Sequence, residues 1–221
     1  MPSQVPRSFG IRSALAAAGV ICVVVGVAIW LHSSFDRSAS GSGSEASTRA
    51  TDDAPSRTTA NCGVPRHPFR PVRVTVPEVT RGAPVVATRR DSSGVPGVPP
   101  LTDAGKHELA WDAGGIRPGD PHGHVLMNAH AWPDGSALGN ALLTHLHVGD
   151  LVLVRGAGGL RQCYRVHQRL VVPFPDSPRR VIARYYATTG APRLALITCS
   201  GQRLGPGVWT HRTLWFARPV H

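Results

Sequence analysis

Three residues whose side chains could do chemistry each lie at or near the end of a short apolar, β-prone run. Cys199 ends the run at residues 194–198, and His130 ends an earlier run at residues 125–129. Arg212 lies on the next strand-like run, where it can lie beside the cysteine. Thiol acyl transfer needs a thiolate, a group that moves protons and a positive charge for the developing oxyanion. The order His, Cys, Arg therefore favours a cysteine transpeptidase over a passive domain.

Each of the three residues also has an ordinary interpretation. Free cysteines are often buried and inert, and His130 is one of eleven histidines. Strand arginines are commonly solvated, and Arg203 and Arg218 are rivals to Arg212. Trp209, three residues before Arg212, favours Arg212 as the functional one.

The other histidines give little reason to expect a metal. His122, His124, His145 and His147 form two His-x-His pairs. No cysteine or acidic residue accompanies them at the spacing of a metal site. We therefore predict no metal ligands.

Short β-prone runs broken by Gly, Pro and Asp dominate the chain from residue 69 onward. A single segment, residues 138–147, has apolar residues at helical spacing. Many strands with one or two short helices predict an all-β domain, a small closed β-barrel, with a jelly-roll sandwich as the main alternative. The expected strands are residues 72–76, 85–88, 124–129, 151–155, 162–172, 193–198 and 213–217.

The N-terminal part of the chain has a different composition. Residues 14–31 carry no charge and can nearly span a bilayer as a helix. Arg7 and Arg12 precede this run, so the positive-inside rule places the N-terminus in the cytoplasm. The alternative is a signal peptide cleaved near Ser38-Ala39-Ser40. Either way, the rest of the chain is expected outside the cell.

These features predict four segments. They are a cytoplasmic N-terminus at residues 1–10, a single-pass membrane anchor at 11–32, a flexible extracellular tether at 33–68 and the catalytic barrel at 69–221. The tether is rich in Ser, Thr, Ala and Gly, which cannot bury a core. The net charge of +11 comes from scattered arginines. Such scatter argues against nucleic-acid binding and is more compatible with an acidic envelope polymer.

The cysteine and arginine runs together resemble the sortase family of cysteine transpeptidases. Leu196, Thr198 and Cys199 match three of the four specified positions of the family's TLxTC signature, and Ala195 stands where the signature has threonine. The run Val208-Trp209-Thr210-His211-Arg212 resembles the family's arginine strand. The resemblance implies a sortase-like small closed β-barrel.

The region before the histidine looks most like the actinobacterial class F branch of that family. Pro118-Gly119-Asp120, after Leu109-Ala110-Trp111, precedes the strand that ends at His130. Asn128-Ala129 stands before the histidine, where many members have a glycine. The whole resemblance covers residues 69–221.

The resemblance also implies a reaction. Cys199 would attack the Thr–Gly bond of an LPxTG-like sorting motif and form a thioester, which an amine on a peptidoglycan precursor or stem peptide would resolve. His130 would protonate the leaving amine and deprotonate the incoming one, and Arg212 would stabilise the oxyanion or hold the substrate backbone. Thr198 would contribute to the substrate groove. The implied partners are surface proteins with a sorting motif and the cell-wall amine, and no metal or organic cofactor is required.

Three other functions compete with this one. An L,D-transpeptidase would need a Ser-His-Gly-Cys-like signature, which residues 197–200 do not match. Papain-like wall peptidases usually place the cysteine before the histidine. The alternative from another class is a catalytically silent, membrane-tethered β-barrel that binds sorting motifs or wall polymer.

Two of the four cysteines could form a disulfide outside the cell. Cys22 lies in the expected anchor, and Cys199 must stay reduced. Alternation along the strand at residues 162–172 groups Cys163 with polar residues, so we expect it to point outward. A Cys62–Cys163 disulfide could then join the tether to the barrel. Two independent thiols are the alternative.

Overall fold

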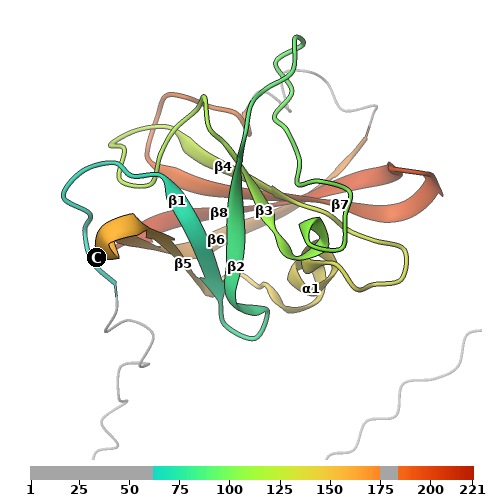
Figure 1. Cartoon of the computed structure of the whole chain (residues 1–221), viewed down its shortest axis with the longest axis horizontal. Coiled ribbons are helices and arrows are strands. Elements are labelled where there is room, and N and C mark those ends of the chain that lie inside the picture. Colours follow the sequence, from blue (N-terminus) through green and yellow to red (C-terminus); the bar gives the residue numbers. More distant parts are fainter. Residues whose placement is uncertain (1–61, 175–183) are drawn as a thin grey trace, which may run out of the picture. The chain divides into compact units, whose positions relative to one another are not determined.

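Eight β-strands make up most of the structure, a computed structural model that describes residues 62–174 and 184–221 (Figure 1). The strands are β1 (Pro71–Val76), β2 (Thr80–Thr88), β3 (Leu109–Asp112), β4 (His124–Ala129), β5 (Leu151–Gly156), β6 (Arg161–Pro173), β7 (Arg193–Gly205) and β8 (Val208–Val220). They close into a barrel in the order β1-β2-β3-β4-β7-β8-β6-β5. The prediction of an all-β fold with a small closed barrel is confirmed, and the jelly-roll alternative is wrong.

The short helices also agree with the prediction, apart from their ends. The α-helix α1 (Leu138–His145) begins where we expected it and ends two residues earlier. Two 3₁₀ turns, η2 (Gly105–His107) and η3 (Ala157–Gly159), complete the elements. The four-residue strand β3 was not predicted, because its buried residues are too few to show a period.

Two of the strand pairs in the barrel are parallel. β4 pairs with β7 in parallel, with Ala129 opposite Thr198. β2 pairs with β3 in parallel as well. A parallel pair needs a long crossover connection, and residues 89–108 form that connection between β2 and β3.

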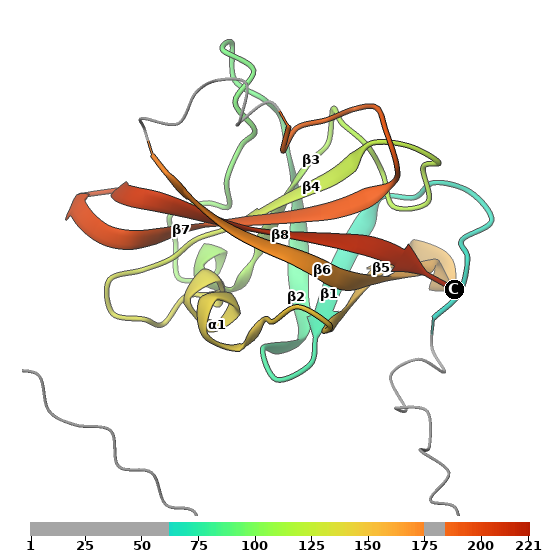
Figure 2. The ribbon, with the colours of Figure 1, turned by 180° about the vertical axis from the view of Figure 1, so that it is seen from behind.

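The strands β7 and β8 run further than the sequence pattern indicated. They pair in antiparallel fashion as far as Gly205 and Val208, beyond the expected ends at residues 198 and 213. Figure 2 shows this hairpin extending past the rest of the barrel. The extra residues are mostly exposed and polar on β7, so they carry no apolar signal.

Burial on both sides explains the unbroken apolar run of β7. Leu194 and Leu196 belong to the main core inside the barrel, together with Trp215. Ala195 and Ile197 face the other way, into a second cluster with Leu126, Tyr185, Leu214 and Phe216. Strands covered on both faces lack polar alternation.

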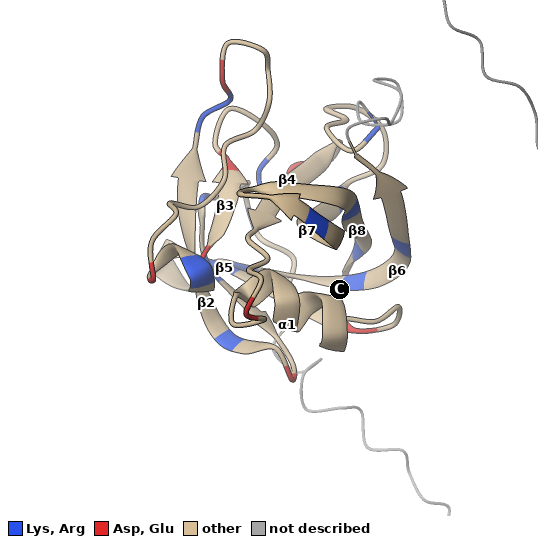
Figure 3. Cartoon of the chain, turned by 90° about the vertical axis from the view of Figure 1, so that its right-hand side faces the viewer, with Lys and Arg blue, Asp and Glu red and all other residues tan. Residues whose placement is uncertain are grey.

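Charged residues are spread over several elements rather than gathered in one place, as the side view shows (Figure 3). The carboxylate of Asp112, at the end of β3, is buried and accepts a hydrogen bond of 2.8 Å from Nε of Arg90. Because a buried carboxylate is costly without a partner, this pair holds the start of the residue 89–108 connection against the barrel.

The structure contains the Cys62–Cys163 disulfide. Cys163 is only 1% exposed, but it points away from the barrel interior as expected, because its neighbours Tyr164 and Val166 belong to the core cluster and Cys163 does not. The segment before β1 reaches it through Cys62, whose sulfur is bonded to that of Cys163. Residue parity therefore gave the correct face, and the low exposure of Cys163 comes from its disulfide partner outside the sheet.

The predicted N-terminus, anchor and first 29 residues of the predicted tether (residues 33–61) lie outside the described residues. Among the residues that the structure does describe, no helix is long and apolar enough to cross a membrane.

Candidate active site

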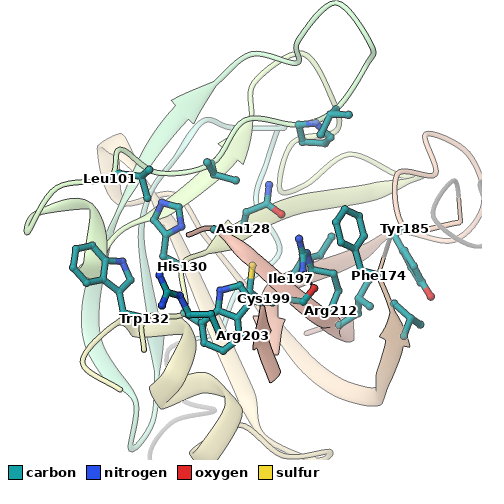
Figure 4. A pocket seen from close by; sticks show the side chains of 18 of the residues that line it. Leu101, Asn128, His130, Trp132, Phe174, Tyr185, Ile197, Cys199, Arg203 and Arg212 are labelled. Atoms are coloured by element: carbon teal, nitrogen blue, oxygen red, sulfur yellow. Dashed lines mark hydrogen bonds between the residues drawn. The ribbon is translucent and has the colours of Figure 1, made fainter. Parts of the chain in front are cut away.

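The candidate catalytic residues meet in a pocket of about 600 Å³ at the barrel end where β4 finishes (Figure 4). Cys199, His130 and Arg212 all contribute to its lining. Other walls come from the β2–β3 connection, from the end of β6 and from the β7–β8 hairpin. Most of the lining is apolar, with Val98, Trp132, Phe174, Tyr185, Ile197 and Trp209 among the contributors.

Strand pairing brings the three residues together from distant parts of the sequence. Because β4 and β7 are parallel and Ala129 is opposite Thr198, His130 follows the end of β4 at the level of Cys199, which lies within β7. Cys199 is also directly paired with Arg212 across β7 and β8. The structure therefore brings the three residues to one pocket, but only His130 follows a strand end, because Cys199 and Arg212 lie within β7 and β8.

The imidazole of His130 contacts a main-chain carbonyl. Its Nε2 lies 2.6 Å from the oxygen of Pro99, in the β2–β3 connection. Just before the histidine, Nδ2 of Asn128 donates to the carbonyl of Gly97 at 3.0 Å. Behind it, the side-chain amide of Asn140 bonds both the N–H and the carbonyl of Trp132. The chain around His130 is therefore held from both sides.

The guanidinium of Arg212 is held by its own strand and by one aromatic ring. Its Nη1 donates to the carbonyl of His211 at 3.0 Å and to that of Trp209 at 3.4 Å. Its Cζ lies 3.9 Å from the centre of the Phe174 ring. Of the two rivals, Arg203 lines the same pocket, whereas Arg218 is exposed and is paired with Arg165 across β6 and β8.

The thiol of Cys199 has two opposing influences on its pKa. Burial raises the pKa, because the thiolate loses hydration, and the positive charge of Arg212 lowers it by a smaller amount. The net direction is upward. Cys199 is therefore mainly a thiol at neutral pH, and the arginine alone does not ionise it. It is the one free cysteine among the described residues.

Thr198, which we predicted to bind substrate, has a different position. Its side chain is 2% exposed, and its hydroxyl donates to the carbonyl of Ala129 at 2.9 Å. It lies outside the pocket lining and joins β7 to β4. Gly139 of α1 approaches the same point, and a Cβ there would overlap the Thr198 hydroxyl and the His130 carbonyl.

Sequence reasoning missed the carbonyl that contacts His130 and two aromatic residues of the pocket lining. The carbonyl of Pro99 has no side-chain signature, and Phe174 and Tyr185 follow no recognisable motif. The proline-rich composition of residues 95–101 was the available signal for the segment that carries Pro99. Within the described ranges, no three His, Cys, Asp or Glu side chains gather as metal ligands would.

Among known proteins, similarity is found in structure and not in sequence. No family model and no curated protein matches the chain. Solved structures with a similar fold include sortase C1 of Streptococcus agalactiae in complex with MTSET, at 20% identity and a TM-score of 0.47 over 67% of this chain and 68% of that one. A pilus-related sortase C of Group B Streptococcus has 20% identity and a TM-score of 0.49, over 69% and 68%. Sortase C1 of Streptococcus suis has 20% identity and a TM-score of 0.47, over 70% and 74%. At these values the likeness concerns the fold, and the chemistry has to come from the pocket itself.

Proposed function

We propose that this protein is a sortase-type cysteine transpeptidase. The observation that carries the proposal is the strand register that sets Cys199 beside Arg212 and brings His130 to the same pocket. A thiol, a proton-transfer group and a fixed positive charge around one cavity are what acyl transfer through a thioester needs.

The first half of the reaction transfers an acyl group to sulfur. The sulfur of Cys199 attacks the scissile carbonyl carbon, and the thiol proton passes to His130. The oxyanion that develops lies beside the guanidinium of Arg212, which is permanently charged. The C–N bond then breaks, and the leaving amine takes the proton from His130. The products of this half are a thioester on Cys199 and a free C-terminal fragment.

The second half restores the enzyme. A second amine attacks the thioester carbonyl and gives a proton to His130. The C–S bond breaks, a new amide forms, and the thiolate of Cys199 takes the proton back. The raised pKa of Cys199 fits this sequence, because a thiol that ionises only during attack needs the histidine as its base.

The character of the pocket supports a peptide with apolar residues before the scissile bond. Its volume of about 600 Å³ and its apolar, aromatic walls can bury several side chains. We propose an LPxTG-like sorting motif as donor and an amine on a peptidoglycan precursor or stem peptide as acceptor. We also propose a single-pass anchor at residues 11–32, with the barrel outside the cell. The class F subtype stays a prediction from the sequence.

The test uses the full chain with a fluorogenic LPxTG-type peptide, an excess of amine and intact-mass spectrometry. We expect a thioester adduct on Cys199 and an amine-linked product. Cys199→Ala should form neither, while a Cys199→Ser protein with unchanged thermal unfolding would show that loss of activity is chemical. Binding of the peptide without an adduct in the reduced, folded wild type would contradict the proposal and favour a silent binding barrel.

A further inference from the structure

We propose that the main-chain carbonyl of Pro99 is a positioning group for His130. It holds a proton on Nε2 of the imidazole and so makes Nδ1 the atom that exchanges protons with substrate. This inference rests on the proposed function for its catalytic meaning. Its structural part can be tested without any substrate.

The hydrogen bond between the two residues fixes the donor. A carbonyl oxygen only accepts hydrogen bonds, so the ring nitrogen 2.6 Å from Pro99 must carry a proton. A neutral imidazole has one N–H. While this bond holds, Nδ1 has the free lone pair that takes a proton, and after protonation Nδ1–H is the group that gives it up.

The segment that carries this carbonyl is stiff. We call residues 95–101, Val95-Pro96-Gly97-Val98-Pro99-Pro100-Leu101, the strap. Its three prolines have fixed φ angles, and each residue before a proline is restricted to extended conformations. Little conformational entropy is therefore left to lose when the strap is ordered. Such a segment can hold a carbonyl in one place although it has no regular secondary structure.

Contacts on both sides fix the strap against the barrel. Asn128 donates to the carbonyl of Gly97, and a Cβ on Gly97 would lie 2.7 Å from Cβ of Thr88. After the strap, the backbone of Gly105 packs against the carbonyl of Pro100, where a Cβ would overlap the oxygen. Gly105 therefore restricts Pro100, the residue that directly follows the Pro99 carbonyl.

The lysine that follows adds a further anchor. Nζ of Lys106 lies 4.0 Å from the centre of the Trp132 ring, two residues after His130. Its side chain is largely buried and is also paired with Asp103. This cation–π contact joins the β2–β3 connection directly to the chain that carries the histidine.

The strap borders the pocket and does not fill it. Val95, Pro96, Val98 and Leu101 line the cavity, which still has about 600 Å³, and Cys199 stays partly exposed. A strap that merely obstructed the site would have to be removed for activity. A strap that orients His130 must stay in place. The two roles predict opposite results when the strap is displaced.

The experiment displaces the strap with small changes remote from the reacting atoms. Gly105→Ala pushes the Pro100 carbonyl away, and Lys106→Met removes the charge over Trp132 while keeping the chain length. Lys106→Arg should restore the contact, because a guanidinium also stacks on an indole. Gly114→Ala is the matched control, since a Cβ there meets nothing closer than 4.0 Å.

The first measurement is the tautomer of His130, by ¹⁵N NMR of the full chain with labelled histidine at a pH where the ring is neutral. His130→Gln assigns the signal. We expect Nε2–H in the wild type, in Lys106→Arg and in Gly114→Ala. Gly105→Ala and Lys106→Met should show a mixture of tautomers. A wild type that is mainly Nδ1–H, or a Lys106→Met spectrum identical to wild type, would overturn the proposal.

The second measurement is turnover of the sorting peptide and alkylation of Cys199 by iodoacetamide. We expect kcat to fall about tenfold in Gly105→Ala and Lys106→Met with KM little changed, because only proton transfer is impaired. Faster turnover with faster alkylation would show an obstructing cover and overturn the proposal. If Gly105→Ala fails to fold, the comparison of Lys106→Met with Lys106→Arg tests the proposal. A wild type that shows Nε2–H but turns over no peptide would contradict the proposed function and not the positioning.

Discussion

The pocket has two sides that are built in different ways. On one side, Cys199 and Arg212 are neighbours in a strand ladder, and the parallel pairing of β4 and β7 brings His130 beside them. On the other side, the strap and Phe174 reach the same groups from connecting segments. The strand side supplies the reacting side chains, and the connecting side supplies main-chain and aromatic contacts that orient them. The strand register thus places the reacting side chains, and the connecting segments orient them.

Replacing the arginine of the strand side should have the largest effect. Arg212→Met removes the charge beside Cys199, and we expect kcat for thioester formation to fall about 10²–10³-fold, the loss typical of a missing oxyanion partner. Arg203→Met is the matched control, because Arg203 lines the same pocket without pairing with the cysteine. We expect the control to change kcat less than about threefold. A larger loss in Arg203→Met than in Arg212→Met would reverse the assignment.

The point where α1 meets both strand ends should show the next largest effect, on stability. In Gly139→Ala the new Cβ overlaps the His130 carbonyl and the Thr198 hydroxyl. Overpacking of this kind costs about 2 kcal/mol in the free energy of unfolding, measured by urea denaturation. Gly82→Ala is the control, because a Cβ there makes only ordinary contacts at 3.7 Å. Equal stability of the two variants would show that the strand ends do not depend on this approach.

The sequence was informative where side chains and periodicity carry the structure. The apolar runs predicted β4, which ends just before His130, and the part of β7 that leads to Cys199, and one-face spacing predicted α1. The extension of β7 and β8 was missed, because its residues are solvated and lack an apolar pattern. The face of Cys163 was predicted correctly, but its near-complete burial was not, because covering by the segment around Cys62 depends on tertiary contacts. The role of Pro99 could not be derived, since any residue has a carbonyl and only the crossover geometry brings this one to His130.

The pH dependence of Cys199 ionisation can distinguish the effect of burial on the pKa from the effect of Arg212, its partner on β8. Because burial raises the pKa and Arg212 lowers it, the rate of iodoacetamide alkylation should rise at a higher pH than for a free thiol such as glutathione. Arg212→Met should shift this profile to still higher pH, since the favourable charge is lost. A shift to lower pH in that variant would mean that Arg212 does not act on the thiolate. The measurement needs no peptide substrate.

The smallest effect should come from the aromatic contact that the connecting side makes with Arg212. Phe174→Leu keeps an apolar side chain but removes the ring 3.9 Å from the guanidinium. A cation–π contact at a partly exposed site contributes about 0.5–1 kcal/mol, so we expect kcat/KM to fall about two- to fivefold. Phe174→Tyr keeps the ring and should retain wild-type kcat/KM. The N–H of Phe174 bonds the carbonyl of Thr210 and is common to all three proteins, so the main chain is not altered.

In an Arg212→Met background, Phe174→Leu should have no further effect, because the ring then has no charge to orient. An unchanged loss in that background would show that Phe174 contacts the substrate directly, and the separation of the two sides would fail at this residue.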